Sequence, residues 1–153
     1  MRVAIAAILL AAATMAAGPS RPAAAKARLC VHSAGDVARY CGPAEARVSA
    51  FPGVLFRKGS CTQSRTGGVP LLQVHIGAKS LVSSRTNGGL TLFTLQLTGP
   101  LSHPTSGLVL AYFKSSYWQG RSTSFRGNAR AGTFRAEGVF PSRGHATGSF
   151  RCY

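Results

Sequence analysis

Glycine and proline interrupt the chain so often after residue 51 that no helix of ordinary length fits between them. The chain contains 18 Gly and 8 Pro. Glycine is unfavourable inside a helix, and proline removes a backbone donor and fixes φ. The interruptions are Pro52-Gly53, Gly67-Gly68, Pro70, Gly77, Gly88-Gly89, Gly99-Pro100, Gly107, Gly120, Gly127, Gly132, Gly138, Gly144 and Gly148. The segments left between them have the length of β-strands, so we predict an all-β domain over residues 51–153.

Alternation of apolar and polar residues supports strands in these segments. Leu72, Val74 and Ile76 alternate with polar side chains, and residues 91–97 repeat the pattern. Residues 107–114 are almost continuously apolar, which predicts a central strand covered on both faces. Several antiparallel strands at this spacing are typical of a β-sandwich or a small closed barrel, and the spacing leaves both open.

The last two segments predict a hairpin. A turn centred near Ser142-Arg143 would place Ala136 opposite Phe150 and Arg135 opposite Arg151. The apolar residues then match across the pair, with Phe140 on the core side of the first strand.

The N-terminus has the pattern of a signal peptide. Arg2 precedes an uncharged apolar run, 3–17, and Ala23 and Ala25 are small residues at the positions that cleavage after Ala25 requires. We therefore predict a leader over 1–25 and a mature protein that is secreted, either extracellular or periplasmic. An uncleaved N-terminal anchor is the alternative. No later apolar run reaches the length of a transmembrane helix. We expect the mature protein to be a monomer.

Four cysteines in an exported chain predict two disulfides. Cys30 and Cys41 bracket a short segment and suit a local bridge, which leaves Cys61 to pair with Cys152. The sequence has no C-x-x-C pair, so a zinc site is disfavoured and no metal is expected.

Residues 26–50 differ from the rest and predict a small helical cap. Ser33 stands three residues before Asp36, as in a helix N-terminus, and Gly42-Pro43 would end that helix. Pro43 can open a second helical turn.

The charge is strongly one-sided. The chain has 18 Lys and Arg against 3 Asp and Glu, a formal net charge of +15. So few carboxylates leave little material for paired acid–base catalysis or for an oxygen-ligand metal site. Lys114 precedes a cluster of cations in the final third, namely Arg121, Arg126, Arg130, Arg135, Arg143 and Arg151. Guanidinium groups suit phosphate, sulfate and carboxylate, whereas a charge that merely keeps the protein soluble is the alternative.

Aromatic residues lie just before this cluster. Tyr117 and the sole tryptophan, Trp118, would either present rings for stacking on a sugar or base, or pack into the core with the indole N–H on a carbonyl. We predict a non-catalytic domain that binds an anionic polymer or the cell-envelope surface, with sugar and nucleic acid left open. The candidate binding residues are Lys114, Tyr117, Trp118, Arg121, Arg126, Arg135 and Arg151.

A small secreted hydrolase is the competing interpretation. Glu137, His145 and either Arg135 or Arg151 would provide a base, an acid and a phosphate clamp, as in a ribonuclease. No metal-ligand spacing, G-x-S-x-G motif or cofactor signature accompanies them, so we assign no catalytic residue and no cofactor.

Two short stretches resemble known exported proteins. The ending 132–152 resembles endings among exported proteins of GC-rich bacteria. Trp118-Gln119-Gly120-Arg121 is similar to a stretch of the secreted subtilisin-inhibitor family, which also has a leader and four cysteines. That resemblance implies protease inhibition as a further alternative, although the interval from Cys61 to Cys152 departs from the two local bridges of that family.

Overall fold

The computed structural model describes residues 31–80 and 90–153, where strands joined by turns and loops are present and no helix is. The predicted leader lies outside the described residues. The described residues contain no helix of the length and apolarity that a membrane span requires. The strands are β1 (Val31–Ala34), β2 (Val37–Tyr40), β3 (Ala44–Val48), β4 (Phe56–Arg57), β5 (Gly59–Thr66), β6 (Val69–Ser80), β7 (Thr91–Thr98), β8 (Ser106–Phe113), β9 (Ser116–Gly127), β10 (Ala131–Gly138) and β11 (His145–Cys152).

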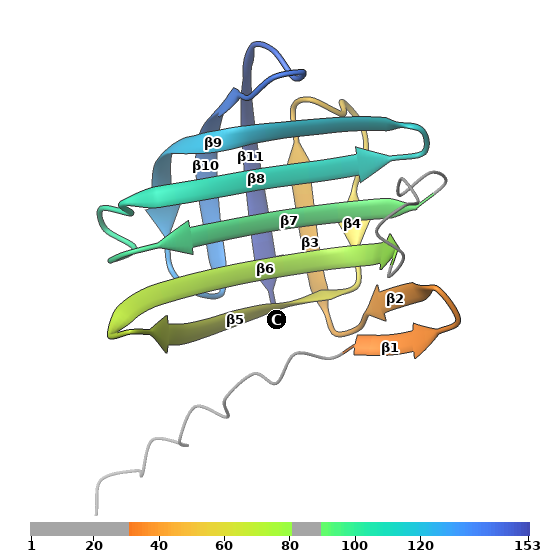
Figure 1. Cartoon of the computed structure of the whole chain (residues 1–153), viewed down its shortest axis with the longest axis horizontal. Coiled ribbons are helices and arrows are strands. Elements are labelled where there is room, and N and C mark those ends of the chain that lie inside the picture. Colours follow the sequence, from red (N-terminus) through yellow and green to blue (C-terminus); the bar gives the residue numbers. More distant parts are fainter. Residues whose placement is uncertain (1–30, 81–89) are drawn as a thin grey trace, which may run out of the picture.

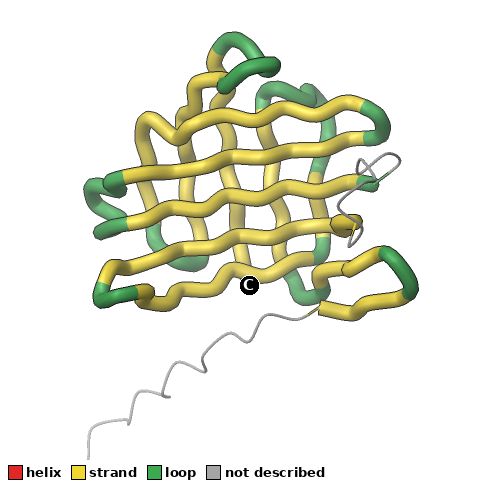
Figure 2. The backbone as a smooth tube through the Cα atoms, viewed as in Figure 1, coloured by secondary structure: helices red, strands yellow, loops and turns green. Residues whose placement is uncertain are grey.

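In the described ranges, all strands join one antiparallel sheet with the order β1-β2-β6-β7-β8-β9-β10-β11-β3-β4, and β5 also pairs with β6. The sheet bends back on itself as a half-barrel. Strands β5 to β8 form a front layer and run across the strands β3, β4, β10 and β11 of the rear layer (Figures 1 and 2). The all-β prediction is confirmed. Of the two architectures left open, neither applies in full, because one continuous bent sheet takes the place of two sheets or a closed barrel.

Strand β9 carries the chain from one layer to the other. Its first half pairs with β8 and its second half with β10. The pairing with β10 shifts register between Arg135 and Ala136, where Thr123 is the extra residue on β9. Such a bulge bends a strand and increases its twist, which explains the corner at this point.

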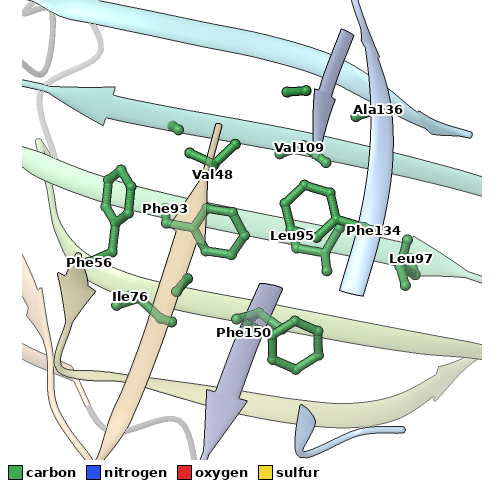
Figure 3. Packing of buried hydrophobic residues seen from close by; sticks show 14 of the residues in the cluster. Val48, Phe56, Ile76, Phe93, Leu95, Leu97, Val109, Phe134, Ala136 and Phe150 are labelled. Carbon is green, nitrogen blue, oxygen red and sulfur yellow. The ribbon is translucent and has the colours of Figure 1, made fainter. Parts of the chain in front are cut away.

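The core lies between the two layers and confirms the predicted alternation. In the front layer the fully buried side chains include Leu72, Val74, Ile76, Phe93, Leu95 and Leu97. The Phe93 ring lies 5.8 Å from the rings of both Phe56 and Phe134, which belong to the rear layer (Figure 3). One set of aromatic contacts therefore joins both layers into a single core.

Strand β8 departs from the prediction of a strand covered on both faces. Val109 and Ala111 are buried in the core, but Leu108 on the opposite face is 48% exposed. The apolar run therefore reflects a partly apolar outer face and not a second covering layer.

The predicted helical cap is not supported, because residues 31–48 form strands. Gly35, with φ of 55°, and Asp36 form the turn between β1 and β2, where Ala34 pairs with Val37. Glycine tolerates this left-handed conformation, so the Gly-Asp pair is a hairpin turn and not part of a helix. Strand β3 buries every second residue, namely Ala44, Ala46 and Val48, and pairs with β11.

The hairpin of β10 and β11 forms with a register four residues from the predicted one. Phe134 pairs with Gly148 and Arg135 with Thr147, so Arg135 does not face Arg151. The loop is longer than predicted: it covers 139–144, because Val139 and Phe140 leave the strand. Phe140 is 82% exposed, so the prediction that it faces the core is wrong. A shift of four residues preserves the inward face, since side chains alternate with a period of two.

The disulfide between Cys61 and Cys152 is confirmed. It joins β5, which pairs with β6 in the front layer, to the end of β11 in the rear layer, across a separation of 91 residues. Cys41 is also disulfide-bonded. The predicted partner of Cys41, Cys30, lies outside the described residues.

Candidate functional site

Several arginines of the rear-layer strands point away from the core and lie on the outer face of that layer. The pairing of β9, β10, β11 and β3 aligns Arg126, Thr133, Ser149 and Arg47 in one row across the four strands. At about 4.8 Å between neighbouring strands, the backbones of Arg126 and Arg47 stand about 14 Å apart. Arg135 lies in the adjacent row beside Ser124 and Thr147.

This face is hollowed. A depression of about 760 Å³ is lined from the strands by Arg47, Arg126 and Arg135, and from the loop between β3 and β4 by residues 51–54. We call this depression the arginine groove. Its hydroxyl-bearing lining residues are Ser49, Ser124, Thr133, Thr147 and Ser149. None of the chain's 3 acidic residues lines it.

A second depression, of about 430 Å³, continues the arginine groove. It shares Arg47 and Arg126 with the groove and adds Arg151 and Glu45. The Glu45 carboxylate accepts a hydrogen bond of 2.9 Å from the Tyr153 hydroxyl, and the Arg151 guanidinium lies 5.9 Å from the Tyr153 ring centre. The acid at this end is thus engaged by a hydroxyl, while the cations remain exposed.

The hydroxyl groups near the bulge fix the geometry of β9 beside Arg135. The Ser122 and Thr123 hydroxyls donate to the Arg135 carbonyl at 3.4 Å and 3.3 Å. These bonds satisfy the carbonyl where the ladder is interrupted. The bulge also changes the alternation, so that Arg121 and Arg126 both face outward although their numbers differ in parity.

The structure divides the predicted binding residues between the layers. Arg126 and Arg135 lie in the arginine groove and Arg151 lies in the neighbouring depression, whereas Arg121 faces outward between Leu108 and Glu137 at the corner. Lys114 is exposed at the turn between β8 and β9, with its ammonium 5.5 Å from the Phe113 ring centre.

The two aromatic candidates lie on opposite sides of the sheet. Tyr117 is 43% exposed on the outer face of the front layer, where its ring stacks on Tyr112 at 5.5 Å. Trp118 is 8% exposed and belongs to the core cluster. Its indole N–H donates to the Arg143 carbonyl at 3.4 Å. The Trp118 ring also covers Gly120, where an added Cβ would meet the indole. Trp118 therefore serves packing and presents no stacking surface.

Arg47 is the groove residue that sequence reasoning missed. It lies in the segment 26–50, which was predicted to be a helical cap, and it is far in sequence from the cation cluster of the final third. The alternation of Ala44, Ala46 and Val48 with Glu45 and Arg47 was a usable strand signal. Small alanines made that signal weak, because alanine is also the best helix former.

The candidate hydrolase residues come together only in part. Glu137 and His145 are direct partners across β10 and β11, and Arg121 flanks Glu137 on its other side. Arg151 lies six residues along β11 from His145. Neither Glu137 nor His145 lines one of the two depressions described.

The chemistry of the arginine groove is that of an oxyanion site. Guanidinium groups donate paired hydrogen bonds to phosphate, sulfate or carboxylate, and hydroxyl groups can add single ones. The aromatic rings that line the groove are engaged elsewhere: the Phe51 ring packs against Phe56 and Phe113, and Phe125 and Phe134 are buried in the core. No protein-family model, curated protein or solved structure matches this chain.

Proposed function

We propose that the protein is a non-catalytic, exported β domain that binds an anionic polymer in the arginine groove. The observation that carries this proposal is the row of Arg126, Thr133, Ser149 and Arg47, with Arg135 beside it. A row about 14 Å long, with a cation at each end, suits repeated anions of an extended chain better than one compact anion. Because the outer face offers no free stacking ring in the groove, recognition rests on the anionic groups.

The test is a salt series with polyphosphate and with a sulfated glycan, using the mature protein and Arg47→Ser/Arg126→Ser. Each lost contact to an anionic group lowers the slope of log K against log salt by about one, so the double variant should lose about two. Arg39→Ser/Arg65→Ser is the matched control, because it removes the same charge from exposed positions of β2 and β5. Equal losses in the two double variants would reduce the proposal to unspecific charge.

A small hydrolase is the second candidate, since Glu137 and His145 are cross-strand partners. RNA cleavage is assayed in the same samples. Turnover that disappears in His145→Ala, with polymer binding retained, would establish this second candidate and overturn the non-catalytic assignment.

A further inference from the structure

The loop between β10 and β11, residues 139–144, exposes a large apolar side chain. Phe140 is 82% exposed, more than any other large apolar residue of the described part of the chain, and the adjacent Val139 is 44% exposed. Pro141 follows and is also exposed. The loop projects beyond the edge of the sheet in Figure 1, where it is the topmost feature. An apolar tip of this kind marks an interaction site more often than an isolated exposed leucine does.

The exposure of Phe140 is built into the fold, because hydrogen bonds hold the loop on both sides. Within the loop, Gly138 N donates to Gly144 O at 2.7 Å and Ser142 N donates to Val139 O at 3.0 Å. Strand β9 supplies the remaining bonds. They run from Val139 N to Gln119 O at 3.1 Å, from Gln119 N to Ser142 Oγ at 2.9 Å, from Gln119 Nε2 to Phe140 O at 3.1 Å, and from Trp118 Nε1 to Arg143 O at 3.4 Å.

Because of these bonds, several polar backbone groups of the loop do not depend on water for a hydrogen-bond partner. The Phe140 and Arg143 carbonyls and the Val139 and Ser142 amides already have partners. Moving a polar backbone group out of water is costly only when it has no partner. These four groups can therefore move into a less polar layer without losing a hydrogen-bond partner, and the apolar side chains of Val139 and Phe140 gain by doing so.

Two arginines lie close to the base of this tip. Arg143 lies within the loop, and Arg121 lies on β9 one pair below the point where Gly120 meets Gly138. An apolar tip with two arginines beside it matches the interface of an anionic bilayer, in which acyl chains lie below negative head groups. A specific protein partner would need about 800 Å² on each side, which one phenylalanine, one valine and one proline do not provide.

We propose that the 139–144 loop anchors the protein to anionic lipid bilayers by inserting Phe140 below the head groups, with Arg121 and Arg143 on the lipid phosphates. This inference does not depend on the arginine groove, which none of the residues 139–144 lines.

The test is vesicle flotation of the mature protein with phosphatidylcholine vesicles, with and without phosphatidylglycerol. Wild type should float with the anionic vesicles, and Phe140→Ser should reduce partitioning by about tenfold, because the apolar gain of the ring is lost. Val69→Ser is the matched control, since Val69 is 43% exposed at the turn between β5 and β6. Equal partitioning of Phe140→Ser and wild type would overturn the proposal, as would failure of wild type to bind either vesicle.

A second variant tests insertion directly. Phe140→Trp should keep vesicle binding, and its emission, taken as the difference from wild type, should shift to the blue and be quenched by brominated lipids. Unchanged emission on bound vesicles would exclude insertion. Adding Arg47→Ser/Arg126→Ser to Phe140→Trp should leave the blue shift in place while polyphosphate binding falls, so that failure of one proposal is distinguishable from failure of the other.

Discussion

The two layers of the half-barrel share one core but have different outer faces. On the front layer the outward positions of β8 and β9 include Leu108, Leu110 and the stacked pair Tyr112 and Tyr117. On the rear layer the corresponding positions hold arginines and hydroxyl groups. The inward-facing residues of both layers are apolar and belong to one core cluster.

This difference shows that strand pairing, not position along the chain, gathers the charge. The predicted cluster from Lys114 to Arg151 is divided between the turn, the corner and the rear layer, whereas Arg47, far earlier in the chain, joins Arg126 and Arg135. How far the two layers are separate can be tested by substitutions in the shared core, in the disulfide and at a titratable residue of the front layer.

Phe93→Ala tests whether both layers depend on one core. Phe93 is fully buried and contacts Phe56 and Phe134 across the layers, so its truncation should lower the free energy of unfolding by about 3–5 kcal/mol. Urea unfolding is followed by Trp118 emission and by far-ultraviolet circular dichroism. Both probes should report one shared transition. Leu108→Ala, at the 48% exposed outer position, is the control and should change stability by about 0.5 kcal/mol or less. Two separate transitions would mean that the layers unfold independently.

Cys61→Ala/Cys152→Ala tests the covalent link between the layers. The disulfide closes a loop of 91 residues, and its loss should lower the free energy of unfolding by about 2–5 kcal/mol, through the larger entropy of the unfolded chain. Chemical denaturation under non-reducing conditions measures the change. Ser60→Ala is a nearby control: the Ser60 hydroxyl is buried without a hydrogen-bond partner among the described residues, so the variant should be at least as stable as wild type. A double variant as stable as wild type would show that the noncovalent contacts of β5 hold it in place without the disulfide.

His75 tests a titratable group that belongs to the front layer alone. Burial, reinforced by the positive charge of Lys79, lowers the pKa of His75 below 6.5. Its ring stacks on Tyr40 at 5.0 Å and lies 3.4 Å from the Thr94 hydroxyl. Because the unfolded chain takes up the proton more readily, the stability from neutral His75 is complete above pH 6.5 and decreases as the pH falls below it.

The measurement is the urea midpoint above and below pH 6.5 in wild type and in His75→Gln. The variant should lose less stability on acidification than wild type does. Arg135→Gln, in the rear layer, should retain the wild-type pH dependence, since arginine does not titrate in this range. Parallel losses in wild type and His75→Gln would show that another group causes the acid sensitivity.

Much of the fold was predictable because it depends on local alternation. The buried faces of residues 72–76, 93–97 and 134–136 follow from a period of two, and the Cys61–Cys152 bridge followed from the even cysteine count and the spacing. A period of two does not predict strand β9, because the bulge at Thr123 interrupts the alternation. The inward positions are the even-numbered Trp118 and Gly120 before the bulge and the odd-numbered Phe125 after it. An extra residue of this kind has no signature in an alternating pattern.

The antiparallel β architecture and the inward residues of the clearest strands could be predicted from the amino-acid sequence, because both depend on side chains that are neighbours along the chain. The register of β10 and β11, the position of Arg47 in the same row as Arg126, and the outward direction of Phe140 depend on the three-dimensional fold. The physical reason is that a shift of register by an even number of residues leaves every buried face unchanged. Contacts distant in sequence, such as those of Gln119 with the 139–144 loop, select one register among those that burial alone allows.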